Sequence, residues 1–230
     1  MTQGNEPEPV HATRAGFHRS LDQIDDAFVE AGAIVAESLP RLTRAFLAGN
    51  RESIEDARAM ASDVQGRCHH VEESGFVMLA REAPVAGDLR RLVALLRLVV
   101  DVDRSAALLK HVSETLDRFD PRDLPEAQRQ QLTDLGERAT DVFRRGLDAW
   151  RSKDALAITE VDVADEGVDR LQQVILDHAA QVDNAGDEML VLGLIARYYE
   201  RIADHGVALA RDATFVVTGE RVTLPSRSDR

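Results

Sequence analysis

The sequence contains a single cysteine and few aromatic residues. Cys68 is the only cysteine among 230 residues, so no disulfide can form within the chain, which suits a reducing compartment. Phe, Trp and Tyr make up 4% of the residues, whereas β-strands are enriched in aromatic and β-branched side chains. Ala, Leu, Arg, Glu and Asp are plentiful instead, so we expect helices rather than sheets.

A long apolar run is also missing. The longest, residues 92–100, is interrupted by Arg97 and is far shorter than the roughly 20 residues that a membrane-spanning helix needs. Residues 1–10 are polar and contain two prolines, so they lack the apolar stretch of a signal peptide. We therefore expect a cytoplasmic protein, and any contact with the membrane should be peripheral, at its inner face.

Basic residues are outnumbered by acidic ones. Lys and Arg total 28 against 41 Asp and Glu, which gives a net charge of −13. An acidic surface repels the phosphate backbone, so we expect no nucleic-acid partner. Acidity also suits cation binding, although an acidic solvated surface alone gives the same net charge.

Apolar residues recur at helical spacing through most of the chain, which predicts an all-α fold. Glycine and proline divide the pattern, and Asp123 with Glu126 has the spacing of a capping box at the start of the fourth helix. The predicted helices cover about 14–48, 51–82, 86–118, 123–151, 152–182 and 185–218.

The order of helices and breaks predicts an internal repeat. Three long helices, a break containing Pro121 and Pro125, and three more long helices follow one another. Short connections between long helices favour antiparallel packing, so each half is predicted to be a three-helix bundle. We expect a disordered tail at 1–13, bundles at 14–120 and 121–220, and a second disordered tail at 221–230. A single six-helix bundle is the structural alternative.

Two predicted helices of the second half carry acids at a spacing of four residues. Asp165 and Asp169 lie on the fifth helix, and Glu200 and Asp204 lie on the sixth. This spacing places both acids of a pair on one face of a helix, at the edge of its apolar arc. Packed helices can bring such edges together, and carboxylate oxygens suit hard cations, Fe and Mn. A solvated acidic face is the alternative reading.

Four short motifs, in order along the chain, resemble those of the PhoU family. They are Arg14-x-x-Phe17-x-x-x-Leu21, Pro84-Val-Ala-Gly-Asp88-Leu-Arg90, Asp165-Glu-Gly-Val-Asp169-Arg-Leu171 and Glu200-Arg-Ile-Ala-Asp204-His205. Each motif is weak alone, but the resemblance covers residues 14–219 and both halves.

The resemblance implies two tandem three-helix bundles and a non-enzymatic regulator. Such a protein would act as a negative regulator of phosphate uptake and of the phosphate-starvation response, including transcription of the phosphate regulon. It would link the ATPase subunit of a phosphate ABC transporter to a sensor histidine kinase, and we expect a homodimer. The resemblance also implies bound metal, for which Fe, Zn, Mn, Ni and Mg are candidates.

The metal ligands implied by the resemblance belong to the second half. They are Asp165, Asp169, Glu200 and Asp204, with Asp162 and His205 as further candidates. In the first half, the matching positions hold Ala61, Gln65, Asp103 and Ala107, so only Asp103 remains of a degenerate site, with Glu72 and Glu73 nearby. We therefore expect metal at the second site only.

Other functions leave different signatures in a sequence. A di-iron carboxylate enzyme would use Glu-x-x-His pairs on facing helices, and none of the six predicted helices contains a Glu-x-x-His. A phosphatase or kinase would need a phosphate-binding loop or a nucleophile constellation, and neither is found. A PhoU-like metal-binding adaptor that serves another signalling response, and an interaction bundle without metal, both remain open alternatives.

Overall fold

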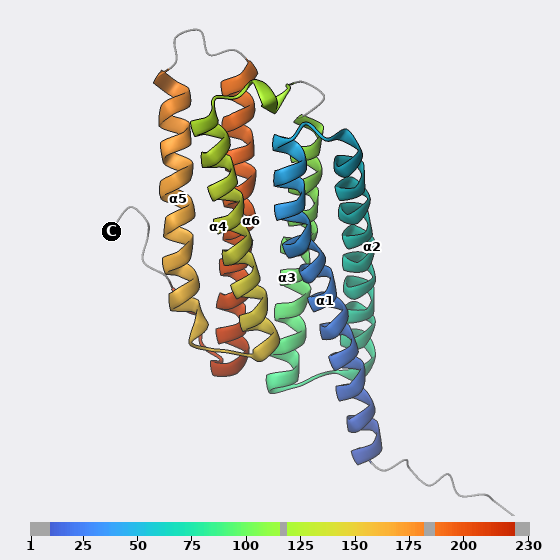
Figure 1. Ribbon diagram of the computed structural model, residues 1–230. Helices are drawn as coiled ribbons and strands as arrows, with labels where there is room; N and C mark the ends of the chain where they lie inside the picture. Colours follow the sequence, from blue (N-terminus) through green and yellow to red (C-terminus); the bar gives the residue numbers. More distant parts are fainter. Residues whose placement is uncertain (1–9, 116–118, 182–186, 224–230) are drawn as a thin grey trace, which may run out of the picture.

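The computed structural model describes residues 10–115, 119–181 and 187–223, which fold into six long α-helices and one short 3-10 helix (Figure 1). The elements are α1 (Val10–Leu47), α2 (Arg51–Glu82), α3 (Ala86–Thr115), η1 (Pro121–Asp123), α4 (Glu126–Ser152), α5 (Ala157–Gln181) and α6 (Asp187–Thr218). The described residues contain no strand, and the predicted all-α class is confirmed.

The helices form two three-helix halves that lie side by side. α1, α2 and α3 pack on one another, and α4, α5 and α6 do the same (Figure 1). Across the halves, α1 packs on α4 and α3 packs on α6. One continuous hydrophobic core runs through both halves, with Phe28, Leu98, Phe143 and Ile202 among its buried members. The predicted duplication is therefore present, and burial of apolar surface at the contact between the halves joins them.

The repeat is visible in the backbone at the end of the first helix of each half. Gly49 has a φ of 63°, and the Gly49 and Asn50 amides donate to the carbonyls of Phe46 and Ala45. Lys153 has a φ of 55°, and the Lys153 and Asp154 amides donate to Trp150 and Ala149 in the same way. Left-handed backbone favours glycine at such ends. Lys153 adopts it without being a glycine, and its side chain makes contacts that are described below.

Two glycines let α4 and α6 approach each other closely. A Cβ atom added to Gly146 would lie 1.9 Å from the Gly206 carbonyl oxygen, and one added to Gly206 would lie 2.6 Å from the Cα of Phe143. Neither position can hold a larger residue without moving a helix. Nearby, Tyr199 of α6 reaches α1, where its hydroxyl lies 2.8 Å from the Thr43 hydroxyl. These contacts fix how deep α6 sits between its neighbours.

Several helix ends differ from the prediction. The first helix begins at Val10 rather than near residue 14. The capping box at Asp123 is wrong: α4 begins at Glu126, after Pro125, which makes no side-chain capping bond. A proline disfavours helical backbone at the residue before it, and Leu124 is extended, so the helix begins only after Pro125. Asp120 instead caps η1 by accepting from the amide of Arg122.

The remaining end predictions fall partly outside the described residues. Asp88 lies in the first turn of α3, which begins at Ala86, and its carboxylate contacts His18 at 3.1 Å. Residues 220–223 have no regular structure, whereas the tail predictions for 1–9 and 224–230 lie outside the described residues. Among the helices that the structure describes, none is both long and apolar enough to cross a membrane.

Candidate functional site

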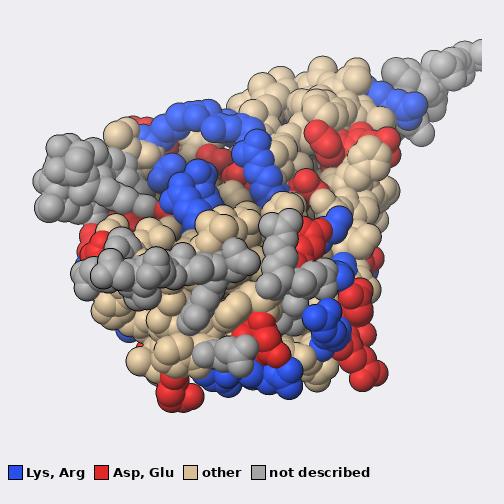
Figure 2. All heavy atoms as spheres, turned by 90° about the horizontal axis from the view of Figure 1, so that it is seen from above, with Lys and Arg blue, Asp and Glu red and all other residues tan. Residues whose placement is uncertain are grey.

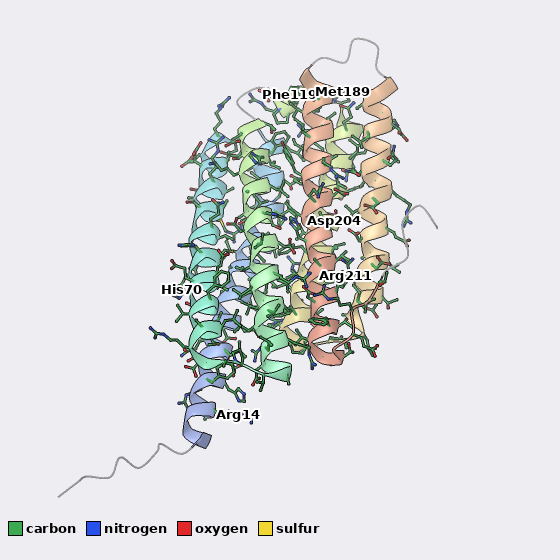
Figure 3. The ribbon with its side chains drawn as sticks, turned by 180° about the vertical axis from the view of Figure 1, so that it is seen from behind. Arg14, His70, Phe119, Met189, Asp204 and Arg211 are labelled. Atoms are coloured by element: carbon green, nitrogen blue, oxygen red, sulfur yellow. The ribbon has the colours of Figure 1, made fainter. Side chains whose placement is uncertain are left out.

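The motif that begins at Glu200 lies in the middle of α6, and successive residues face different neighbours. Ile202 is fully buried in the core, and Gly206 meets α4. His205 faces α3, where its Nδ1 lies 2.8 Å from the Ser105 hydroxyl. Asp204 lies midway along α6, between α3 and α5 (Figure 3). This short segment therefore contacts three other helices, because each residue turns about 100° from the last.

The two predicted acid pairs lie deeper than expected. Their positions at the edges of the apolar arcs predicted that these acids would lie at the rim of the bundle. However, Asp165 is only 1% exposed and Glu200 only 5%. Asp169, Asp204 and Asp162 are half-buried. Arg197, one turn before Glu200, donates to both Glu200 carboxylate oxygens at 2.8 and 2.9 Å. A buried carboxylate is thus stabilised by a partly exposed guanidinium.

The acids of the two helices influence one another's charge. Burial raises the pKa of the Glu200 carboxyl above its ordinary value, and the charges of Asp204 and Asp169 raise it further, whereas Arg197 lowers it. Glu200, Asp204 and Asp169, three of the four predicted ligands, therefore form one electrostatic cluster between α5 and α6. Repulsion within the cluster favours a bound proton or cation.

His205 faces α3 rather than the acids of α5, although the charge of adjacent Asp204 still acts on it. Burial, the largest influence, lowers the pKa of the His205 imidazole to about 4, so the ring is neutral near pH 7. With Nδ1 held at Ser105, the ring belongs to the contact between α3 and α6. The structure therefore separates this candidate ligand from the acids of α5.

The first half presents a reduced version of the site. Ala61 is buried, Gln65 is exposed and Ala107 is half-buried, so these positions supply no carboxylate. Burial, followed by the charges of Asp103 and Glu72, raises the pKa of the Cys68 thiol to about 12, which places both acids near Cys68. Glu73 points elsewhere and pairs with His69 at 3.3 Å.

The carboxylates of the second half are suitable ligands for a hard cation, but their arrangement in the structure is less suitable. Clustered carboxylates are the ligands such ions prefer. However, Arg197 holds both oxygens of Glu200, and no three His, Cys, Asp or Glu side chains in the described residues are placed to hold one ion. A cation at Glu200 would therefore have to displace Arg197.

Sequence reasoning missed a buried ionic cluster between the halves. Asp25 of α1 accepts from the indole N–H of Trp150 at 2.6 Å, from Lys153 Nζ at 2.9 Å and from Arg91 Nε at 3.1 Å. Arg91 also donates to Asp22 at 2.7 Å. The sequence shows an acid at position 25 within an apolar face of α1, but not the residues that pair with it.

Known proteins share this architecture. The crystal structure of the phosphate transport system regulatory protein PhoU from Streptococcus pneumoniae superposes with a TM-score of 0.81 at 19% identity, covering 90% of this chain and 100% of that one. PhoU from Pseudomonas aeruginosa also gives 0.81, at 20% identity, covering 89% and 100%. The chain therefore has the fold of duplicated three-helix-bundle proteins.

Sequence comparison identifies the family. The PhoU domain model matches residues 28–116 and 132–213, one match in each half. The phosphate-specific transport system accessory protein PhoU homolog 1 of Mycobacterium leprae is 30% identical over 217 residues, which cover 90% of this chain and 94% of that protein. The PhoU homolog of Synechocystis is 28% identical over 228 residues, covering 95% and 96%. The chain belongs to the PhoU family.

Family membership also decides between the broad classes of function. The matched proteins are named as accessory or regulatory proteins of phosphate transport. The chain therefore belongs to a family whose matched members are named for accessory or regulatory roles and not for a reaction, which agrees with the non-enzymatic class that its sequence predicted.

Proposed function

We propose that the chain is a cytoplasmic negative regulator of phosphate uptake and of the phosphate-starvation response. It would link the ATPase subunit of a phosphate ABC transporter to a sensor histidine kinase. The observation that carries this proposal is the match of the PhoU domain to both halves of the chain. Relatives named for phosphate-specific transport, aligned over nearly the whole chain, give further support.

The proposed partners can be tested by crosslinking in cells grown with ample phosphate. The tagged chain is captured, and crosslinked peptides are identified by mass spectrometry. We expect peptides from a transporter ATPase subunit or a sensor kinase. Recovery of neither, with the tagged chain still restoring phosphate regulation to a deletion strain, would contradict the proposed link. Recovery of components of a different signalling pathway would favour an adaptor for another response.

Metal binding by the second half is a separate proposal. Asp165, Asp169, Glu200 and Asp204 would be the ligands, and binding would require Arg197 to leave Glu200. Burial is the main cause of the raised pKa of Glu200, and repulsion by Asp204 and Asp169 adds to it; this repulsion supports the proposal. A cation would relieve the repulsion and stabilise the folded chain by mass action.

Metal analysis of the purified chain tests the ligand assignment. Changing Glu200 to Gln and Asp204 to Asn together should remove the bound metal. The matched control, Asp103→Asn in the reduced first-half site, should leave the metal content nearly unchanged. Metal that survives the double substitution would contradict the assignment.

The state of assembly is also a proposal. We expect a homodimer that meets its transporter at the inner face of the membrane. Sedimentation equilibrium of the purified chain measures the first point, because a dimer has twice the mass of the 25.4 kDa chain. A monomer at all concentrations tested would contradict it.

A further inference from the structure

An apolar stripe lies exposed along the outer face of α3. Leu89, Val93 and Val100 are exposed, although each is a large hydrophobic residue, and Leu96 between them is half-buried. The steps of four, three and four residues are those of a heptad, so these side chains form one line along the helix. Such a line is typical of a surface that packs against another helix.

The stripe continues onto α2. At Gly75 an added Cβ would lie 2.7 Å from Leu96 Cδ2, so Leu96 packs directly against the backbone of α2. Phe76, the next residue, has 56% of its surface exposed. The apolar stripe is therefore made of Leu89, Val93, Leu96 and Val100, and exposed Phe76 follows the glycine of α2 that Leu96 contacts. A line of exposed apolar residues marks an interaction site more strongly than scattered residues do.

Arginines flank the apolar stripe on the side of α6. Arg97 and Arg104 are exposed and seven residues apart, which is about 10 Å along the helix. Arg97 acts electrostatically on Asp212 of α6, and Arg104 acts on His205, so both lie on this side of α3. Seen from above, Lys and Arg side chains gather at the edge of the molecule where α3 and α6 lie (Figure 2).

This arginine flank contrasts with the net charge of −13. Among the described residues, neither Arg97 nor Arg104 has a carboxylate within the 4.0 Å of an ion pair. Exposed Arg201 and Arg211 lie on the neighbouring α6 and likewise form no such pair with a described residue. Arg97 and Arg104 act on the charge of half-buried Asp101, and Arg97 acts also on Asp212, but neither acid lies within ion-pair distance. The guanidinium groups can therefore still bind a carboxylate brought by a partner with two hydrogen bonds.

We propose that the apolar stripe and its arginine flank dock an amphipathic α-helix of a partner protein. The partner helix would carry apolar residues at heptad spacing and Glu or Asp at the positions facing Arg97 and Arg104. A second copy of this chain fits less well, because antiparallel pairing through α3 about a two-fold axis would place the two arginine flanks against each other. The charges select the partner, and the apolar stripe supplies buried area.

A synthetic helical peptide provides the probe. It has Leu at the a and d positions of three heptads and Glu along one flank, and a control peptide has Lys in place of those Glu residues. Binding to the full chain is measured by fluorescence anisotropy at low and at physiological salt. We expect the Glu peptide to bind at least tenfold more tightly than the Lys peptide, with the difference shrinking as salt rises.

Variants of the full chain locate the binding. Changing Arg97 and Arg104 together to Glu should weaken the Glu peptide about tenfold or more and strengthen the Lys peptide. The matched control is Arg144→Glu, an exposed arginine of α4, which should leave binding within about twofold. Changing Val93 and Val100 together to Ser should also weaken binding, whereas Val163→Ser on the exposed side of α5 should not.

Three results would overturn this inference: equal binding of the two peptides, unchanged binding in the double Glu variant, or a photocrosslinker at Val93 that captures only a second copy of the chain. The inference rests on the proposed function only in assigning a protein partner to the chain. Peptide binding is measured without cells, so its failure is distinguishable from failure of the phosphate response.

Discussion

Replacing Asp25 with Asn should destabilise the protein strongly, because one carboxylate balances two cations between the halves. The side chain of Asp25 is 9% exposed, and those of Arg91 and Lys153 are 24% and 28% exposed. Removing one partner of a buried ion pair costs about 3–5 kcal/mol. Partial exposure of the cations, and the contact of Arg91 with Asp22, should reduce the loss to about 2–3 kcal/mol.

Unfolding by heat and by urea measures this loss. For a chain of this length, 2–3 kcal/mol corresponds to a fall in Tm of about 5–10 °C. Trp150 is the only tryptophan and donates to Asp25, so its fluorescence reports on the cluster directly. The control is Asp22→Asn, whose side chain is 60% exposed and which should cost less than about 1 kcal/mol.

A second substitution, Lys153→Gly, should change the free energy of unfolding in opposite directions in two backgrounds. Lys153 has a left-handed backbone that costs a non-glycine residue about 1–2 kcal/mol. In the wild-type chain, Lys153→Gly relieves this strain but removes the contacts with Asp25 and with the Trp150 ring at 3.9 Å. In the Asp25→Asn chain, the same change should stabilise, because the lysine has lost its counter-charge. Asp25→Asn costing no more than Asp22→Asn, or Lys153→Gly having equal effects in both chains, would refute the account.

Three further changes test the packing and the buried titratable groups. Gly206→Ala should destabilise the chain by more than about 3 kcal/mol, because the new Cβ would meet the Phe143 backbone. Gly66→Ala, with open space around it, should instead stabilise α2 by about 0.5–1 kcal/mol. Urea unfolding measures both changes, and equal effects would contradict the close crossing of α4 and α6. The pKa of His205 is lowered in the folded chain, so the unfolded chain binds a proton more readily, and stability should fall as pH drops from about 6.5 towards 4. The His205→Gln variant should lose less stability over that range than the wild type, and parallel pH profiles would contradict this. Cys68 is buried, and its pKa is raised to about 12, so it should react with a thiol reagent at pH 8 only as fast as the chain opens. Labelling of Cys68 that does not slow when urea is withdrawn would contradict its burial.

The sequence predicted the helices and their order because apolar periodicity reports which side of each helix is buried. It also placed Glu200 and Asp204 with Asp169, since all three lie at edges of apolar arcs. It did not predict how deep Asp165 and Glu200 lie, because depth depends on how closely neighbouring helices approach. For α6 and α4 this approach depends on Gly146 and Gly206, which meet in the structure although they are 60 residues apart in the chain.

Two other misses have local causes. The spacing of Asp123 and Glu126 suggested a cap, but Pro125 between them keeps Leu124 extended, so α4 begins after the proline. Asp25 was passed over because a charged residue in an apolar stripe has no meaning until its partners are known. Arg91 and Lys153 come from other helices, and no spacing in the sequence connects them with Asp25.

Deleting the gene and measuring phosphate uptake and phosphatase expression in cells with ample phosphate tests the central claim most directly. The proposed function predicts that the deletion strain takes up phosphate faster and expresses phosphatase despite the ample supply. The wild-type chain, supplied from a plasmid, should return both to the low level. A deletion strain whose uptake and phosphatase expression match those of the parent at every phosphate concentration would contradict regulation of phosphate uptake by this protein.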